Sequence, residues 1–273
     1  MASAPIFLLT DFGDQDAYVG VMKAVMVGIE PMLQVVDLCH NIEPQNVVSA
    51  SYVLLTAVPY LPRGSVVVAV VDPGVGTERR IVALAFKQFI LLAPDNGIAT
   101  LVLDRFRCER AVAVEYGRVA FHQPSATFHG RDVFAPAAAY LASGRLALEH
   151  LGETIEVTSL VQLALEPRLD GQVLHASVLH VDRFGNLVTN VEAPRWGITP
   201  AGKWRCHVSG CELPIIRTYG EQEHGQALAY VGSSGFIEIA VRNGSAAERF
   251  GRAPAIILTR QGDTTASPDT SSP

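Results

Sequence analysis

Polar side chains follow several apolar runs of the chain, and their types suit binding and acid–base chemistry. Asp11 comes directly after Ile6–Thr10, and Asp72 comes directly after the run Ser65–Val71. His129 lies just before an Ala-rich segment. Ligands of open α/β sheets bind where strand ends and helix starts converge, so we expect these groups to meet in one crevice. Because function concentrates in such loops, the pattern predicts an enzyme with a carboxylate-rich crevice.

Each polar cluster also has an ordinary structural explanation. Asp72-Pro73-Gly74 and Asp95-Asn96-Gly97 are turn-forming sequences, since Pro presets φ and Gly or Asn tolerates a positive φ. Asp132 is a candidate helix cap, and a single histidine is more often hydrogen-bonded than catalytic. Gly74 and Gly76 do not form a phosphate loop, because no Gly-Lys-Ser/Thr follows them. The residue pattern alone therefore leaves the reaction open.

The first part of the chain alternates between strand-like and helix-like segments. Ser65–Val71 carries β-branched residues on both faces, which is typical of a central parallel strand. Asp14 or Asp16 is expected to cap the first helix. The expected strands are Ile6–Thr10, Leu33–Leu38, Ser65–Val71, Ile81–Phe86 and Phe89–Ala93, and the expected helices are Ala17–Ile29, Val47–Tyr60 and Asp132–Leu141. This order predicts an N-terminal α/β domain over residues 1–165, with a central, mostly parallel sheet.

The pattern changes after Gly171, where short alternating strands are separated by Gly, Pro and Asn. These expected strands are Val173–Val181, Asn186–Val191, Trp204–Val208, Ala227–Tyr230 and Phe236–Ala240. They predict a smaller, all-β, barrel-like C-terminal domain over residues 166–262. Residues 263–273 are rich in Thr, Ser and Pro, and we expect them to form a disordered tail.

Composition excludes several classes of protein. Hydrophobic residues make up 49% of the 273 residues, enough for a substantial core. The net charge of −6 argues against non-specific nucleic-acid binding. No run approaches the ~18 apolar residues of a membrane span, and the N-terminus lacks a basic signal-peptide region. We therefore expect a soluble cytoplasmic protein. Its four cysteines have no CxxC spacing and its histidines no HxH or HxxxH spacing, so no metal is expected.

The polar clusters resemble the signature blocks of the S-adenosyl-L-methionine (SAM) hydroxide adenosyltransferase family, which also contains the SAM-dependent fluorinase and chlorinase. The matching blocks are Leu9–Gly13, Val70–Thr77, Ala93–Gly97, Thr127–Asp132, Val181–Asn190 and Gly232–Ala240. They follow one another in the family's order and span roughly residues 6–260. The resemblance implies an enzyme that hydrolyses SAM to adenosine and L-methionine, by attack of water or hydroxide on the ribose C5′.

Three positions separate the members of this family that use hydroxide from those that use halide. The hydroxide-using members carry Asp, Arg and His, which correspond here to Asp72, Arg79 and His129. Halogenases carry a Tyr in place of Asp72, and fluorinases a Ser in place of Gly130. Chlorinases also tend to have Gly there, so Asp72 is the better discriminator. The alternatives are a chlorinase-like halogenase and a non-catalytic protein that binds an adenosyl ligand.

These residue types suit the implied reaction. The sulfonium leaves as a neutral thioether, so the leaving group needs no general acid, and the reaction needs an in-line nucleophile and a route for its proton. Asp72 would orient the water and accept from it. Arg79 would keep Asp72 ionised and stabilise developing hydroxide character. His129 would hold the water or take its proton. The sequence leaves open which of the three receives the proton.

The resemblance also implies binding residues and an assembly. The binding residues are Asp11 for the ribose hydroxyls, Asp16 and Asp182 for the methionine ammonium, Ser233 for its carboxylate, Asn186 for the adenine edge and Tyr219 for stacking on adenine. SAM is the substrate, and no cofactor is implied. The family's active site lies between the N-terminal domain of one subunit and the C-terminal domain of its neighbour in a homotrimer. Arg80 and Arg131 are expected to form structural ion pairs.

Overall fold

The computed structural model describes residues 3–120, 123–200 and 202–260. The chain divides into two compact units, residues 1–163 and 164–273. The tail expected to be disordered, residues 263–273, lies outside the described residues. No helix in the described ranges is long and apolar enough to cross a membrane.

The first unit is built on one seven-stranded sheet. In sheet order its strands are β2 (Val35–Cys39), β1 (Ile6–Thr10), β3 (Ser65–Val70), β5 (Phe89–Pro94), β4 (Ile81–Phe86), β6 (Cys108–Val114) and β7 (Gly152–Ile155). The first four are parallel, and each later pairing is antiparallel. Five of the seven strands therefore run in one direction, which confirms the mostly parallel sheet. Every side chain of β3 is buried, as expected for a central strand.

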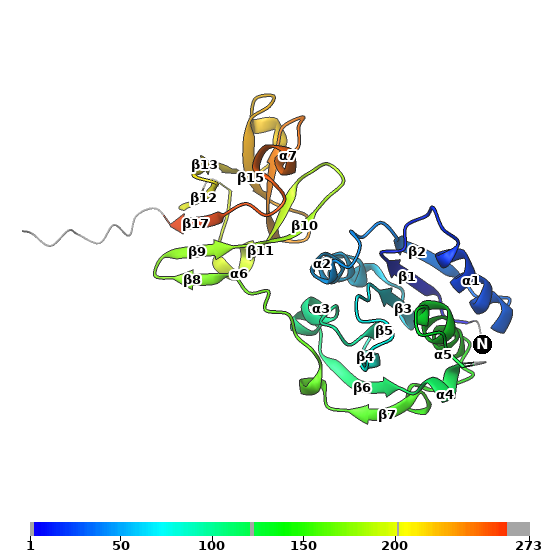
Figure 1. Cartoon of the computed structure of the whole chain (residues 1–273). Coiled ribbons are helices and arrows are strands. Elements are labelled where there is room, and N and C mark those ends of the chain that lie inside the picture. Colours follow the sequence, from blue (N-terminus) through cyan, green and yellow to red (C-terminus); the bar gives the residue numbers. More distant parts are fainter. Residues whose placement is uncertain (1–2, 121–122, 201, 261–273) are drawn as a thin grey trace, which may run out of the picture. The chain divides into compact units, whose positions relative to one another are not determined.

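Helices cover both faces of this sheet. Figure 1 shows α1 (Tyr18–Ile29) and α5 (Ala135–Ala142) on one side, and α2 (Val47–Ala57) and α3 (Thr100–Arg105) on the other. The remaining helical segments of this unit are α4 (Tyr116–Val119), the 3₁₀ turns Val58–Tyr60, Leu148–His150 and Val157–Ser159, and the π turn Gly130–Phe134.

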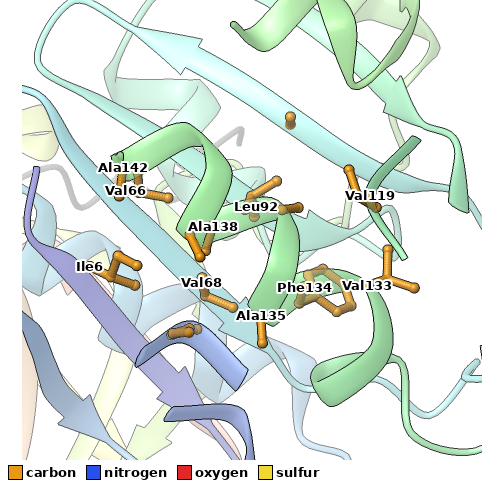
Figure 2. Packing of buried hydrophobic residues seen from close by; sticks show 14 of the residues in the cluster. Ile6, Val66, Val68, Leu92, Val119, Val133, Phe134, Ala135, Ala138 and Ala142 are labelled. Atoms are coloured by element: carbon orange, nitrogen blue, oxygen red, sulfur yellow. The ribbon is translucent and has the colours of Figure 1, made fainter. Parts of the chain in front are cut away.

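Small side chains let α5 lie close to the sheet. Ala138 and Ala142 pack against Val66 and Val68 of β3, beside Ile6 of β1 (Figure 2). These residues belong to a buried apolar cluster that also contains the buried side chains of α1, among them Met22 and Met26. Because packed interiors tolerate little volume change, this cluster fixes the position of α5 and of the loop that precedes it.

Two helix starts differ from the expectation. Neither Asp14 nor Asp16 caps α1, because the cap position is Ala17, which makes no side-chain cap hydrogen bond. The expected helix Asp132–Leu141 begins earlier, as the π turn. Asp132 therefore lies inside a helical turn and does not cap it. Its carboxylate accepts from the Ser125 backbone N–H at 2.8 Å and pairs with Arg131 at 2.6 Å, so the ion pair expected for Arg131 is confirmed.

The second unit contains two five-stranded sheets. One has the order β10 (Val178–Val181), β11 (Leu187–Glu192), β16 (Phe236–Val241), β15 (Ala227–Val231), β14 (Ile215–Ile216). The other has the order β13 (Cys211–Leu213), β12 (Trp204–Val208), β17 (Ile256–Arg260), β9 (Val173–Ala176), β8 (Arg168–Asp170). Short segments complete it: α6 (Ala193–Trp196), the 3₁₀ turn Tyr219–Glu221 and α7 (Ala246–Phe250).

Pairing in the second unit is antiparallel, except between β14 and β15. The expected single strand Val173–Val181 is two strands, β9 and β10, which belong to different sheets. The chain changes sheet at Ser177, whose backbone N–H donates to the Asn190 side chain at 2.9 Å. The antiparallel sheets are confirmed, and their closure into a barrel stays a prediction.

Candidate active site

The order of strands in the first unit creates a crevice beside β1. The chain places β2 on one side of β1 and β3 on the other, and such a reversal of strand order opens a ligand site at the carboxyl ends of the strands. Thr10 pairs with Val70 at those ends, which brings the loops carrying Asp11 and Asp72 together. A cavity of about 180 Å³ lies there, lined by both carboxylates and by His129.

Arg79 joins Asp72 to His129, and we call these three residues the Asp72 cluster. Both Asp72 oxygens accept from Arg79 Nε at 2.9 Å, and Arg79 Nη2 also contacts Oδ2. The same Nη2 lies 2.8 Å from His129 Nδ1. The Asp72 and Arg79 side chains are only 5% and 8% exposed, and His129 is 4% exposed. The structure therefore brings the three residues together in a site largely shielded from water.

The contact with Arg79 fixes the tautomer of His129. A guanidinium can only donate, so Nδ1 must accept, and the single proton of the neutral imidazole is then on Nε2. Burial lowers the pKa of His129 below its ordinary value of 6.5, the charge of Arg79 lowers it further, and Asp72 and Asp132 oppose the shift. His129 is therefore neutral near pH 7 and offers a donor, not a base.

Arg79 has one further donor. Its Nη1 is buried and has no hydrogen-bond partner among the described residues. A buried donor without an acceptor costs free energy, and most such groups in proteins find a partner or bind a water or ligand. Nη1 therefore indicates that an acceptor, such as a water or hydroxide oxygen, belongs beside the Asp72 cluster.

Close backbone approach holds the Asp72 loop in place. Gly76 has φ +79°, and a Cβ at that position would lie 2.4 Å from the Ala126 carbonyl oxygen, so only glycine fits. Asn96 Nδ2 donates to the Val71 carbonyl at 2.9 Å, directly before Asp72. The Asn96 turn thus supports the cavity without lining it.

Arg80, the neighbour of Arg79, faces another partner. Its Nε donates to Asp95 at 2.8 Å, and its Nη1 donates to the Ser159 hydroxyl at 3.2 Å. The ion pair expected for Arg80 is confirmed. Two adjacent arginines therefore differ in role, since Arg79 contacts the cavity residues and Arg80 ties two loops together.

Asp11 is held by the loop that follows β2. Its Oδ2 accepts from the Gln45 backbone N–H at 2.8 Å, and Gln45 has the uncommon φ of +66°. Thr10 Oγ1 lies 2.8 Å from His40 Nδ1, which joins the same two loops. Asp11 Oδ1 makes no hydrogen bond within the described ranges. The carboxylate is thus oriented and still has one oxygen for a ligand.

Three aromatic rings, which the sequence analysis did not select, line the same cavity. They belong to Phe12, Tyr18 and Phe128, and their centroids lie 5.2 to 6.1 Å apart. Aromatic faces attract cations, so this wall suits a positively charged ligand. A signal was present in the sequence, because Phe12 follows Asp11 and Phe128 precedes His129.

Asp16 and Ser233 are both exposed. Among the described residues, those that line the cavity do not include Asp16. Ser233 lies in the turn between β15 and β16 of the second unit. The structure therefore does not group either residue with the other candidates.

The remaining candidates meet within the second unit. Asp182 Oδ1 accepts from the backbone N–H groups of Phe184 and Asn186 at 2.8 Å. Asp182 Oδ2 accepts from Asn186 Nδ2 at 2.7 Å, and Nδ2 also donates to the Tyr219 hydroxyl at 3.2 Å. Asn186 is 5% exposed and Tyr219 37% exposed. The structure therefore joins Asp182, Asn186 and Tyr219.

Two residues that the sequence analysis missed extend this group. The Tyr219 hydroxyl donates to the Tyr230 hydroxyl at 2.5 Å, and Tyr230 donates to Glu238 Oε2. Burial raises the pKa of Glu238, the Tyr230 hydrogen bond opposes this, and the charge of Asp182 raises it further. Burial also raises the pKa of both tyrosines. We call Asp182, Asn186, Tyr219, Tyr230 and Glu238 the Asn186 cluster.

Metal ligands are not grouped in the described part of the chain, where no three or more His, Cys, Asp or Glu side chains could hold an ion. The four cysteines are free. Cys206 is buried, and burial raises its pKa to about 12, so it packs as a small apolar side chain.

Comparison with known proteins gives matches over most of the chain. The SAM hydroxide adenosyltransferase N-terminal domain matches residues 6–152, and the C-terminal domain of the same name matches residues 176–255. A Thermus thermophilus protein named (R)-S-adenosyl-L-methionine hydrolase is 45% identical, over 90% of this chain and 95% of that protein. A Salinispora tropica protein of the same name is 38% identical, over 93% and 97%.

More distant sequences and a solved structure extend this result. A fluorinase from Actinoplanes sp. is 27% identical, over 86% of this chain and 90% of that protein. The crystal structure of an uncharacterized conserved protein from Thermotoga maritima matches with a TM-score of 0.84 and 34% identity. That match covers 93% of this chain and 100% of the other.

Proposed function

The chain belongs to the SAM hydroxide adenosyltransferase family, and we propose that it hydrolyses SAM to adenosine and L-methionine. Water or hydroxide attacks the ribose C5′. The observation that carries this proposal is the buried contact of Asp72 with Arg79, and of Arg79 with His129, beside the cavity. Halogenases of the family have a Tyr where this chain has Asp72. The relatives named as hydrolases are also more similar to it than the fluorinase is.

The protonation states within the Asp72 cluster support Asp72 as the proton acceptor. Arg79 has only donors, and His129 has its Nδ1 occupied and its proton on Nε2. Asp72 is then the member of the cluster whose lone pairs can accept the proton of the water. The water therefore gives its proton to Asp72, while Arg79 Nη1 and His129 Nε2 donate to the attacking oxygen.

The bond changes balance without another reactant. The water oxygen forms a bond to C5′, and the C5′–S bond breaks with its electron pair going to sulfur. The sulfonium becomes the neutral thioether of methionine, so no metal or organic cofactor is required for the leaving group. The proton on Asp72 returns to solvent.

The other cavity residues suit the substrate. Asp11 Oδ1 accepts from the ribose hydroxyls, and the rings of Phe12, Tyr18 and Phe128 face the sulfonium. From the family resemblance, Asn186 and Tyr219 bind the adenine. The resemblance also assigns the methionine ammonium to Asp16 and Asp182, and its carboxylate to Ser233.

We also propose the assembly that the resemblance implies, a homotrimer in the cytoplasm. Each active site would take its Asp72 cluster from one subunit and its Asn186 cluster from the neighbouring subunit. Light scattering coupled to size-exclusion chromatography tests the trimer directly.

Product analysis in oxygen-18 water tests the reaction. The purified protein is incubated with SAM, and we expect one label in the 5′-hydroxyl of adenosine and none in methionine. Methylthioadenosine with labelled homoserine would place the attack on the methionine chain, and S-adenosylhomocysteine with methanol would place it on the methyl group. Either result would overturn the proposal.

Parallel reactions with fluoride or chloride test the alternative activity. We expect no 5′-halo-5′-deoxyadenosine, because the Asp72 carboxylate repels a halide anion at the position where halogenases carry a Tyr. A halogenated product would show a halogenase. Binding of SAM without turnover would instead show a non-catalytic adenosyl-binding protein.

A further inference from the structure

Three side-chain hydrogen bonds in the Asn186 cluster form a chain from Asn186 to Glu238 that runs in one direction. Asn186 donates to Tyr219, Tyr219 donates to Tyr230, and Tyr230 donates to Glu238. Glu238 Oε2 accepts from Tyr230, which fixes the proton of Tyr230 and, through it, the proton of Tyr219. The Tyr219 oxygen is then left as an acceptor toward Asn186.

Asp182 fixes the same amide from the other side. Its Oδ2 lies 2.7 Å from Asn186 Nδ2, and a carboxylate oxygen cannot face the amide oxygen favourably. Both N–H groups of the Asn186 amide are therefore used inside the protein. Asn186 Oδ1 makes no hydrogen bond among the described residues, so the amide offers a ligand an acceptor only.

We propose that Tyr230 and Glu238 are positioning residues for Asn186. They hold its amide so that only the Oδ1 acceptor is offered to the base. Because Oδ1 accepts, the subsite selects a purine with a 6-amino group over one with a 6-oxo group. This inference rests on the proposed function, which places adenine beside Asn186.

The backbone around Glu238 is shaped to keep its carboxylate in place. A Cβ on Gly232 would lie 1.8 Å from Glu238 Oε1, so any larger residue there would displace the Glu238 carboxylate. Tyr230 and Glu238 are also directly paired across β15 and β16, which sets their separation by the sheet register. The end of the hydrogen-bond chain is therefore rigid, as a positioning group needs to be.

The test compares SAM with its deaminated analogue, S-inosyl-L-methionine. For the wild-type protein we expect kcat/KM to be about 100-fold or more lower for the 6-oxo analogue, since an acceptor would face an acceptor. Glu238→Gln keeps the shape but adds a donor, which can reverse the chain. Tyr219 then stops accepting from Asn186, and one amide N–H becomes available to a ligand while Asp182 still holds the other. We expect it to reduce the discrimination to about tenfold or less, mainly through KM, with kcat within about threefold of wild type.

Two further variants provide a second test of the cluster and a matched control. Tyr230→Phe removes the link to Glu238 and should reduce the discrimination as well, if Glu238→Gln does not fold. Glu212→Gln makes the same chemical change at an exposed position in the other sheet, and we expect it to leave the discrimination unchanged. Equal use of both substrates by the wild type, or unchanged discrimination in both cluster variants, would overturn the inference.

Calorimetric binding of adenosine and inosine separates this inference from the proposed reaction. Tighter binding of adenosine by a protein that does not hydrolyse SAM would reject the reaction and keep the inference. Hydrolysis of SAM together with equal binding of both nucleosides would keep the proposed reaction and reject the inference about Asn186.

Discussion

The Asp72 cluster and the Asn186 cluster both contain buried carboxylates, but only the first pairs its carboxylate with a cation. Asp72 is paired with the permanent cation Arg79, so with neutral His129 the formal charges −1, +1 and 0 sum to zero. In the Asn186 cluster, Asp182 and Glu238 receive only neutral amide and hydroxyl donors. Neither carboxylate has a cationic partner within the cluster.

This difference in charge suits one cluster to catalysis and the other to substrate binding. A neutral cluster that lies beside one cavity and has a buried donor without a partner can stabilise a hydroxide that exists only during the reaction. A negatively charged cluster attracts a cationic substrate such as SAM before the reaction starts. The first cluster should therefore control kcat and the second KM, and the following experiments test that division.

Replacing Asp72 should have the largest effect. Asp72→Asn removes the proton acceptor while keeping the side-chain shape, and we expect kcat to fall by about 10³-fold or more. KM should stay within about threefold, which steady-state kinetics with adenosine detection will show. Glu78→Gln is the matched control in the same loop, because Glu78 is exposed. Substantial activity in Asp72→Asn would remove Asp72 as the proton acceptor.

Replacing Arg79 should have the next largest effect and should also move the pH profile. Arg79→Gln removes a donor to the attacking oxygen, and we expect kcat to fall by about 10²-fold. The charge of Arg79 lowers the pKa of His129, so the variant should raise that pKa. Because His129 works in its neutral form, the acid limb of kcat should lie below pH 6.5 in the wild type and move upward in the variant.

The lowered pKa of His129 also makes the free energy of unfolding depend on pH. The folded protein binds a proton at His129 less readily than the unfolded chain does, so this contribution to stability is present above pH 6.5 and is lost as pH falls. Arg79→Gln should weaken that loss in urea unfolding between neutral and mildly acidic pH. An unchanged acid limb would show that His129 does not titrate in the reaction.

Replacing Asn186 should produce the opposite kinetic pattern. Asn186→Ala removes the group that reads the base, and we expect KM to rise by about 10- to 100-fold with kcat within about threefold. Initial rates over a wide range of SAM concentration separate the two constants. A fall in kcat at unchanged KM would show that Asn186 acts in the chemical step. It would contradict the assignment of kcat to the Asp72 cluster and KM to the Asn186 cluster.

The two clusters also differ in how much of them the sequence predicts. Asp11 and Asp72 could be placed at one sheet edge because buried β-branched runs such as Ser65–Val70 identify the strands that carry them. His129 was harder to place, since the helix after it starts as a π turn at Gly130, for which the sequence pattern has no clear signal.

The Asn186 cluster depends on pairing between distant segments. Tyr230 and Glu238 face each other only because β15 and β16 pair in one particular register, and that register is set by the whole sheet. One local signal existed, because Glu238 is the single charged residue in the apolar strand Phe236–Val241. A charged residue in a buried strand requires a partner, and that rule could have prompted a search for Tyr230.

Mixing two damaged subunits tests whether the clusters of one active site come from different chains. Asp72→Ala removes the proposed proton acceptor and Asn186→Ala the proposed adenine contact, so each variant alone should be nearly inactive at low SAM. If each site joins clusters from neighbouring subunits in a trimer, every mixed trimer has about one restored site in three, because only one of its three junctions joins two intact clusters. The measurement is the rate at SAM well below the wild-type KM, using trimers purified through one tag on each variant. If each subunit supplies both clusters of its own site, the mixed trimers will only average the two single-variant rates.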